Sequence, residues 1–371
     1  MRYCYHARTN PGLQGVLAAE LRELTGPDPH VEIRESPDGV RDAVHLISPS
    51  PIEWETFSRM RCAYEIAEIR SAVVRPGLET ATRAEALREV RMAGEESDFP
   101  EIGGDTTFAV RCIRRGRHAP RSPDVERAIG AIIVARTGST VDLAAPGVTV
   151  RVYLYGDVLY CALLMNPFPM DQRFEWLYRP RVALNPVVAA ALLRCAATEI
   201  RDASSPRPQA ARARGAILDP FCGSGTIPLE AASTPALSRR RIYASDIMGE
   251  AVAGTRANLA INARFHCVQT RLADATNLAA VYAGCEIDTI VCDPPFGVRS
   301  GRGLDFATLY AALLDNAAAI LPPGGRLVLM SSRRRGRLNR VIAGRRDWRI
   351  LHVRIIETGG VFPGIFVLQF R

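Results

Sequence analysis

Hydrophobic positions in the first half of the chain mix helical spacing with short strand-like runs. Leu13, Leu17 and Leu21 repeat at helical spacing after an Asn-Pro-Gly turn, and they predict a helix over 12–24. The same patterns predict three more helices, a strand and a hairpin: helices over 51–67, 80–92 and 122–136, a strand over 106–113, and hairpin strands over 148–155 and 158–164. This mixture indicates an α+β region.

The second half alternates strands and helices more regularly. An alanine- and leucine-rich helix is predicted over 182–200, and the Ser, Pro and Arg content of 201–215 predicts an exposed loop. The elements predicted beyond it are strands over 216–218, 241–245, 268–272, 289–292 and 326–330, helices from 226, through 255–262 and over 307–321, and a final strand pair over 350–357 and 365–370. Such alternation is typical of a mostly parallel sheet with helices on both faces.

These patterns divide the chain into three expected regions. They are an α+β region over 1–168, a linker with its long helix over 169–215, and an α/β domain over 216–371 whose sheet ends in an antiparallel hairpin. A length of 371 residues is enough for two or three domains with substantial cores.

Composition narrows the class of protein. Hydrophobic residues make up 47% and charged residues 23% of the chain, and no run approaches the roughly 20 apolar residues of a membrane span. The first residues do not have the pattern of a secretory signal, so we expect a cytoplasmic protein without membrane attachment. The nine cysteines are scattered and odd in number, and they contain no close pair of the zinc or redox kind, so no metal site is expected.

The basic residues are unusual because all 47 are arginine. The absence of lysine excludes P-loop, kinase and Schiff-base chemistry, all of which need a lysine amine. The net charge of +8 favours a polyanionic partner such as nucleic acid.

A glycine-containing loop follows the first predicted strand of the α/β domain. It runs Asp219-Pro-Phe-Cys-Gly-Ser-Gly-Thr226, and its glycines would let a ligand approach the N-terminus of the next helix. The second strand ends at Asp246, where a carboxylate could accept hydrogen bonds from both ribose hydroxyls. The third ends near Asp274, which could bind the amino group of adenine. Alone, either aspartate is more typical of a helix cap.

The fourth strand ends in Asp293-Pro294-Pro295-Phe296-Gly297. Two successive prolines stiffen the loop and leave carbonyl oxygens free. A carboxylate and a rigid carbonyl can together accept both N–H groups of a planar exocyclic amine, while Phe296 stacks on the attached ring. Alone, the pentapeptide is more typical of a proline-rich turn. Its distance from the glycine loop favours an amine-binding site.

The two motifs together resemble the class I S-adenosylmethionine-dependent methyltransferases that act on exocyclic amino nitrogens. The branch with an N-terminal ferredoxin-like and THUMP region is the most similar, and the resemblance covers nearly the whole chain. Its N-terminal signals are Phe108-Ala-Val, the run from Arg114 to His118, the segment 141–146 before the hairpin, and the early Pro11-Gly-Leu.

This resemblance implies an RNA methyltransferase with a Rossmann-like catalytic domain that makes N2-methylguanosine in tRNA, with the THUMP region binding the acceptor end. The implied cofactor is S-adenosylmethionine, bound by Asp219, Cys222, Gly223, Ser224, Gly225, Thr226, Asp246, Asp274 and Asp293. The implied catalytic residues are Asp293, Pro294, Pro295 and Phe296, and the helix after Asn185-Pro186 is similar to the segment that closes over the cofactor. We expect a monomer, because one chain carries both regions.

Arginines cluster in three places suited to RNA phosphates. The predicted RNA-binding residues are Arg111, Arg114, Arg115, Arg117 and Arg121 in the THUMP-like region, Arg299 and Arg302 after the catalytic loop, and Arg333, Arg334 and Arg335 after the fifth strand. Loops after parallel strands share one edge of the sheet, so the last two groups should border the active site.

Three alternatives stay open at this point. The Asp-Pro-Pro-aromatic motif also suits adenine N6, a guanine in ribosomal RNA or a glutamine amide. A non-catalytic RNA-binding protein could keep the methyltransferase fold as a scaffold, although the three aspartates argue against it. A small-molecule methyltransferase would have no use for the arginine-rich N-terminal region.

Overall fold

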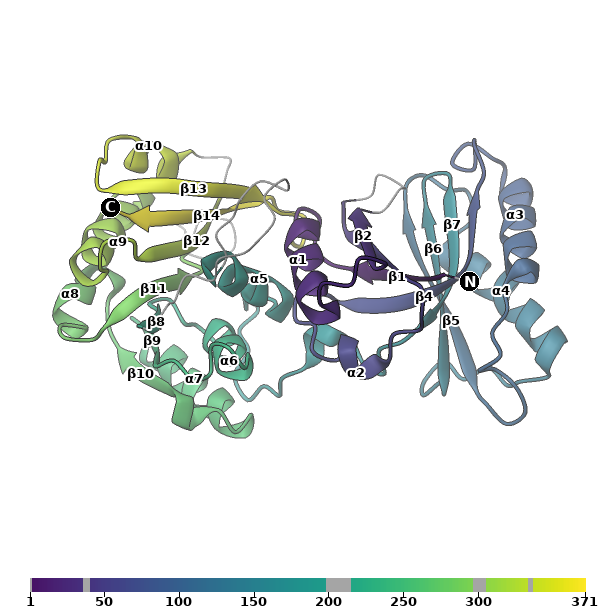
Figure 1. Ribbon diagram of the computed structural model, residues 1–371, viewed down its shortest axis with the longest axis horizontal. Coiled ribbons are helices and arrows are strands. Elements are labelled where there is room, and N and C mark those ends of the chain that lie inside the picture. The colour runs from purple at the N-terminus through teal and green to yellow at the C-terminus, as the bar shows by residue number, and fades with distance from the viewer. Residues whose placement is uncertain (1, 36–40, 198–214, 296–304, 333–335) are drawn as a thin grey trace. The chain divides into compact units, whose positions relative to one another are not determined.

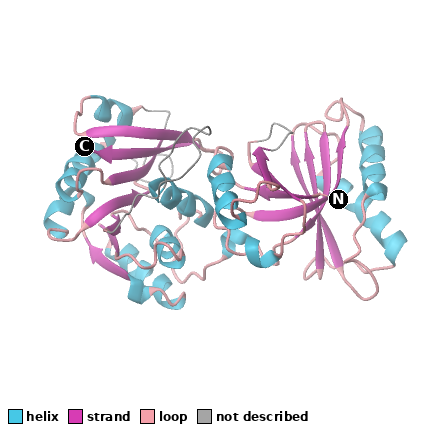
Figure 2. Cartoon of the chain, viewed as in Figure 1, coloured by secondary structure: helices cyan, strands magenta, loops and turns pink. Residues whose placement is uncertain are grey.

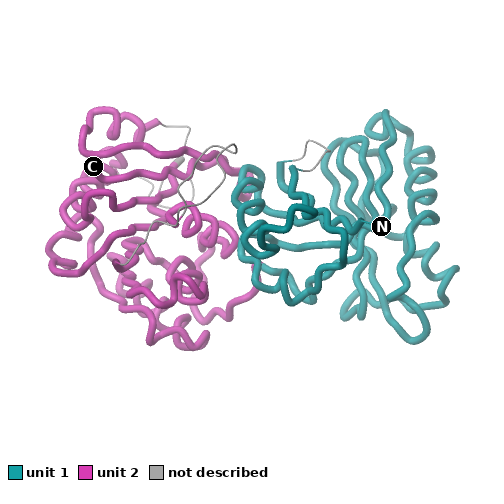
Figure 3. Tube along the Cα trace, viewed as in Figure 1, with its two compact units in different colours: residues 1–170 teal, residues 171–371 magenta. Residues whose placement is uncertain are grey.

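The computed structural model describes residues 2–35, 41–197, 215–295, 305–332 and 336–371. These residues form two compact units, 1–170 and 171–371, which are described separately (Figure 3). The division lies close to the predicted boundary at 168, whereas the further division into linker and catalytic domain remains a prediction.

The described part of unit 1 is built on a seven-stranded sheet in the order β2-β3-β1-β4-β7-β6-β5 (Figure 1). Its strands are β1 Tyr3–Arg8, β2 Glu32–Glu35, β3 Ala43–Ser48, β4 Glu65–Val74, β5 Phe108–Arg115, β6 Val148–Tyr155 and β7 Val158–Leu164. Only β5 and β6 run parallel, and β4 pairs with β7 to join the two halves of the sheet. The predicted hairpin matches β6 and β7.

Helices cover the sheet of unit 1 in two pairs. The helices are α1 Gln14–Thr25, α2 Trp54–Phe57, α3 Arg83–Glu96 and α4 Ser122–Thr137. α3 begins at a capping box between Thr82 and Glu85. α3 and α4 approach so closely that a Cβ on Gly94 would lie 2.6 Å from Cδ1 of Ile129, and they bury an apolar core against β5, β6 and β7.

The helix predicted over 51–67 is wrong. Only the four residues of α2 are helical there, and the strand β4 already begins at Glu65. The buried carboxylate of Glu20, on α1, accepts hydrogen bonds from the backbone N–H groups of Arg61 and Cys62. A tertiary contact thus takes the backbone donors that a helix would have used, and spacing alone does not reveal it.

The described part of unit 2 is built on a second seven-stranded sheet, in the order β10-β9-β8-β11-β12-β14-β13. Its strands are β8 Ala216–Asp219, β9 Ile242–Asp246, β10 Val268–Leu272, β11 Ile287–Cys292, β12 Arg326–Ser332, β13 Trp348–Ile355 and β14 Pro363–Phe370. β8 to β12 are parallel, and β14 is antiparallel to both of its neighbours. This confirms the predicted parallel sheet with a final antiparallel pair.

The helices of unit 2 form two groups (Figure 2). α5 Pro186–Ala197, α6 Thr226–Ser233 and α7 Gly249–Ile261 contact one another or strands β9 to β12. α8 Leu278–Val281, α9 Phe306–Ile320 and α10 Arg337–Ala343 pack together around an apolar core that includes Tyr310, Leu313 and Trp348. Short 3-10 turns lie at Met170–Gln172 (η1), Phe265–Cys267 (η2) and Ala275–Asn277 (η3). None of the described helices is both long and apolar enough to cross a bilayer.

Candidate active site

The loop from β8 to α6 has a backbone that only glycine fits. Gly223 and Gly225 have φ angles of +53° and +84°, in the left-handed region. A Cβ on Gly225 would lie 2.9 Å from Cγ2 of Thr255, so no side chain fits there. A Cβ on Gly223 would meet nothing closer than the carbonyl oxygen of Phe221 at 4.0 Å. The first glycine therefore leaves open space beside the backbone, and the second lets α7 approach.

Asp219 ends β8 and is almost completely buried, with 1% of its surface exposed. Its Oδ1 accepts a hydrogen bond from the backbone N–H of Phe221 at 3.0 Å, whereas its Oδ2 has no hydrogen-bond partner among the described residues. Burial, reinforced by the negative charges of Asp246 and Asp293, raises the pKa of Asp219 well above its usual range. One buried carboxyl oxygen is thus available to a bound ligand.

Asp246 ends β9 and fixes the glycine loop. Its Oδ2 accepts a hydrogen bond from the N–H of Gly223 at 3.0 Å, and its Oδ1 accepts one from the N–H of Met248 at 3.0 Å. Each carboxylate oxygen has a second lone pair for a ligand hydroxyl. The carboxylate therefore lies where the glycine loop meets the start of α7.

Asp274 follows β10, which pairs with β9. Its exposed side chain caps the short turn η3, since Oδ1 accepts hydrogen bonds from the backbone N–H and the hydroxyl of Thr276. The capping role that the sequence allowed is therefore present, and the predicted contact with adenine remains a prediction.

Asp293 and Pro294 follow β11, the strand beside β8. Pro294 is buried and Pro295 is half-buried, and the charge of Asp293 contributes to the raised pKa of Asp219. The two aspartates therefore lie at one edge of the sheet, as predicted for loops after parallel strands. Phe296, Arg299, Arg302, Arg333, Arg334 and Arg335 lie outside the described residues.

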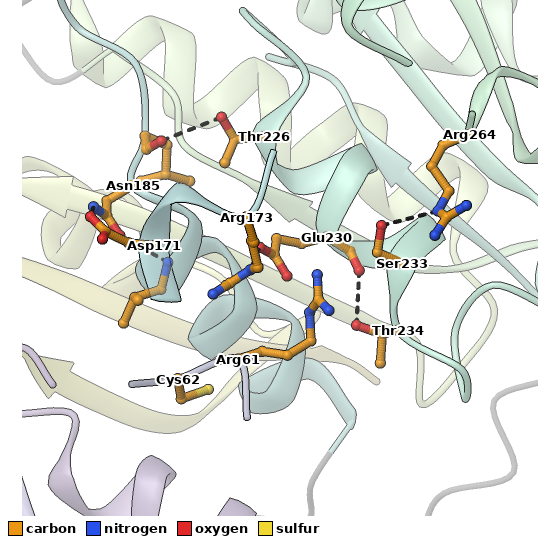
Figure 4. A network of polar contacts seen from close by, with 12 residues as sticks. Arg61, Cys62, Asp171, Arg173, Asn185, Thr226, Glu230, Ser233, Thr234 and Arg264 are labelled. Atoms are coloured by element: carbon orange, nitrogen blue, oxygen red, sulfur yellow. Dashed lines mark hydrogen bonds and ion pairs between the residues drawn. The ribbon is translucent and has the colours of Figure 1, made fainter. Parts of the chain in front are cut away.

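The segment before α5 is bound to α6 by polar contacts (Figure 4). The Thr226 hydroxyl donates to the carbonyl of Leu184 at 3.3 Å, and Arg173 forms a 2.6 Å ion pair with the buried carboxylate of Glu230. Asn185 donates to Asp171 at 3.0 Å and accepts from the N–H of Val187 at the start of α5. The segment before α5 is thus joined to α6 at Thr226 and at Glu230.

The arginines predicted to bind RNA in unit 1 fall into two groups. Arg111 donates to the carbonyl of Leu143, Arg115 contacts the buried Asp42 at 3.2 Å, and Arg114 donates to the carbonyls of His118 and Pro120. These three side chains stabilise the fold of unit 1. Arg115 is nevertheless exposed, and so are Arg117 and Arg121.

A groove of about 450 Å³ lies between α3 and α4. Arg83, Arg91 and Arg127 line it, together with an apolar floor that includes Leu87 and Ile132. Arg83 and Arg127 both pair with Asp124, and Arg91 is exposed. In the described residues, no group of three or more His, Cys, Asp or Glu side chains could hold a metal ion.

Comparison with known proteins identifies the family. A model of the RMKL-like methyltransferase domain matches residues 178–363, and a model of the THUMP domain matches residues 86–163. A tRNA (guanine(6)-N2)-methyltransferase of Thermus thermophilus is 33% identical over 365 residues, which are 98% of each chain. The chain belongs to the THUMP-containing RMKL-like methyltransferases.

Further comparisons agree with this family. The crystal structure of TrmN from Thermus thermophilus is 30% identical with a TM-score of 0.77, and all of both chains is covered. A tRNA (guanine(10)-N2)-dimethyltransferase of Methanothermobacter thermautotrophicus is 30% identical over 280 residues, 74% of this chain and 77% of the relative. The methyltransferase thus has a Rossmann-like catalytic sheet in unit 2 and its THUMP domain in unit 1, and its cofactor is S-adenosylmethionine.

Proposed function

We propose that this methyltransferase transfers a methyl group to the N2 atom of the guanosine at position 6 of tRNA. The observation that carries the position is the full-length match to a guanine-6 enzyme, which covers 98% of both chains. The match to the guanine-10 dimethyltransferase covers only 74% of this chain. We therefore favour position 6 and a single methyl group.

The described residues fit the cofactor. S-adenosylmethionine supplies an electrophilic methyl group on a positively charged sulfur. Gly223 leaves open space beside the backbone, and the unpartnered Oδ2 of Asp219 offers a buried acceptor for the methionine amino group. Asp246 would accept hydrogen bonds from the ribose hydroxyls, and Asp274 from the adenine amino group. Cys222, Ser224 and Thr226 would complete the surface that the glycine loop presents to the cofactor.

Asp293 and Pro294 would hold the target amine. Guanine N2 is a weak nucleophile because its lone pair is delocalised into the ring. Accepting its two hydrogens on the Asp293 carboxylate and the Pro294 carbonyl would turn the lone pair toward the methyl group and stabilise the positive charge that develops on nitrogen. Asp293 or water would then take the proton. Pro295 would stiffen the loop, and Phe296 would stack on the guanine.

Arginines of unit 1 would bind the RNA backbone. The exposed Arg117 and Arg121, together with Arg91 in the groove between α3 and α4, are available to phosphates, which fix the position of an RNA without reading its sequence. We assign the acceptor end of tRNA to the THUMP domain. A paired guanine must leave the helix to enter the site, at a cost of a few kcal/mol that stacking on Phe296 would offset. We further propose a monomer that works in the cytoplasm, where its tRNA substrate is.

The test is to incubate the protein with labelled S-adenosylmethionine and an unmodified tRNA transcript that has guanosine at position 6, then identify the labelled nucleoside by mass spectrometry. A matched transcript in which the base pair containing this guanosine is reversed serves as the control. We expect N2-methylguanosine with the first transcript only. Label that persists in the reversed transcript would contradict position 6, labelled N6-methyladenosine would contradict the base, and no label in tRNA would contradict the proposed substrate.

A further inference from the structure

Asn258 lies in the interior of α7 and uses its whole side chain in hydrogen bonds. It is fully buried. Its Oδ1 accepts from two consecutive backbone N–H groups, those of Leu177 at 2.8 Å and Tyr178 at 3.0 Å. Its Nδ2 donates to the carbonyl of Tyr178 at 2.6 Å and to the carbonyl of Ser224 at 2.8 Å. One amide therefore joins the segment before α5 to the glycine loop.

The neighbouring turns of α7 contact the same segment. Asn262, one turn later, accepts from the N–H of Glu175 at 3.1 Å and donates to its carbonyl at 2.8 Å. Gly254, one turn earlier, lies against the ring of Tyr178, because a Cβ there would be 2.2 Å from its Cδ1 atom. Positions 254, 258 and 262 share one face of the helix. Of the three, Asn258 is the one whose side chain also bonds to the glycine loop.

Tyr178 and the glycine loop that Asp246 binds share the amide of Asn258. Burial, together with the negative charges of Glu250 and Asp246, raises the pKa of the Tyr178 phenol. Asp246 in turn binds the N–H of Gly223, and the hydroxyl of Thr255 donates to the carbonyl of Gly223 at 3.0 Å. The glycine loop is thus bonded to Asp246, to Thr255 and, through Asn258, to the backbone of Tyr178.

We propose that Asn258 is a positioning residue for the cofactor, because it fixes Tyr178 as a wall beside the glycine loop and Asp246. This inference rests on the proposed function, since it takes S-adenosylmethionine as the ligand of the loop. A site whose walls are already fixed loses less conformational entropy when a ligand binds. Without the side-chain amide of Asn258, the carbonyl of Ser224 and the backbone of residues 177–178 lose their shared hydrogen-bond partner. Binding of the cofactor must then also order Tyr178, which lowers the affinity.

The test compares the binding of S-adenosylhomocysteine, the demethylated cofactor, to purified full-length variants by isothermal titration calorimetry. Asn258→Ala should weaken this affinity at least tenfold. Asn262→Ala is the matched control, because it removes an equivalent anchor of the same segment without touching the glycine loop, and it should change the affinity less than twofold. Affinity for tRNA should stay within twofold in both variants.

A second pair of variants perturbs the wall without changing Asn258. Gly254→Ala should push the Tyr178 ring away and weaken binding of S-adenosylhomocysteine at least fivefold. Gly249→Ala, at the start of the same helix where a Cβ would meet nothing within 4 Å, should not. In activity assays, Asn258→Ala and Gly254→Ala should raise KM for the cofactor and leave kcat within threefold, a separation that a general loss of folding would not produce.

The outcomes separate this inference from the proposed function. If the wild-type protein does not bind S-adenosylhomocysteine, the proposed function fails. If the wild type binds but Asn258→Ala binds as tightly as Asn262→Ala, the positioning role is wrong. Should Asn258→Ala fail to fold, the Gly254→Ala and Gly249→Ala pair decides, and equal affinities in that pair overturn the inference.

Discussion

Three aspartates at one edge of the sheet in unit 2 differ because their surroundings differ. Asp219 is buried with a raised pKa, Asp246 is bonded to two backbone N–H groups, and Asp293 follows a strand into a proline-stiffened loop. We therefore assign Asp219 to the methionine amino group of the cofactor, Asp246 to its ribose, and Asp293 to the amine of the substrate. Each role is a proposal that a single substitution can test.

Asp293→Ala should reduce kcat for tRNA methylation at least 100-fold, because the amine loses the acceptor that orients it and stabilises its developing charge. Affinity for S-adenosylhomocysteine should stay within threefold. Single-turnover kinetics and calorimetry measure the two quantities separately, and full activity of this variant would overturn the assigned role.

Asp219→Asn should make the ligand-free protein more stable at pH 7.5. Burial raises the pKa of Asp219, so its contribution to the free energy of unfolding is present in full below the ordinary value of 3.8 and is lost as the pH rises through the folded pKa. Asparagine keeps the acceptor for the N–H of Phe221 without that loss. Thermal unfolding at several pH values should show the advantage of the variant shrinking toward pH 4, and equal stability at pH 7.5 would contradict this.

The sequence predicts the site residues that end strands, and it misses those that act from inside helices. Asp219 and Asp246 are recognisable because each is the last residue of a buried strand, and Asp293 because it directly follows one, where an acidic side chain contributes nothing to an apolar core. Asn258 in a helix is only a weak helix former by sequence, and its four hydrogen bonds depend on residues more than 30 positions away. The arginines show the same limit, since Arg114 and Arg117 look alike in the sequence and differ in their contacts.

At the scale of elements, strands β1 and β3 place two histidines in direct contact inside unit 1. Nδ1 of His6 and Nε2 of His45 are 2.9 Å apart, and the rings of Tyr153, Tyr155 and Tyr160 surround His6. Burial, the proximity of His45 and the charge of Arg8 lower the pKa of His6 well below 6.5. The pair therefore contributes stability only while His6 is neutral.

We expect acid to destabilise the protein through this pair. Because the folded pKa of His6 is lowered, the stabilisation is present above pH 6.5 and is lost as the pH falls toward the folded value. The free energy of unfolding, from urea titration at pH 7.5 and 5.5, should fall more for the wild type than for His6→Gln. An equal fall in both proteins would exclude His6 as the cause.

At the scale of the whole molecule, an excess of arginine gives the chain its charge of +8, and several of these arginines also bond within the protein. Arg111, Arg114 and Arg115 bind backbone carbonyls or a buried carboxylate of unit 1, although Arg115 stays exposed, as Arg117 and Arg121 are. The net charge therefore predicts a polyanionic partner. The contacts that each arginine side chain makes within unit 1 indicate how freely that side chain can bind RNA phosphates.

The double variant Arg117→Ala and Arg121→Ala should weaken tRNA binding and reduce the slope of log affinity against log salt by about 1.8, since each lost phosphate contact contributes about 0.9. Arg114→Ala is the matched control. It removes one positive charge from the end of β5, close in sequence to Arg117, and it should lower the melting temperature without changing the slope. Fluorescence anisotropy at four salt concentrations gives both slopes, and equal slopes in the wild type and the double variant would show that the two exposed arginines do not contact RNA.

The pairing of β4 with β7 has a consequence for how this protein can be divided. The THUMP match covers residues 86–163 and leaves β4 outside, although β4 is hydrogen-bonded to β7 over most of its length. Cutting the chain at the limits of the match would expose the edge of β7, and a bare edge is a template for pairing with other chains. A fragment meant to behave as an independent module must therefore carry β4 with it, and so must begin well before the residues that the family match covers.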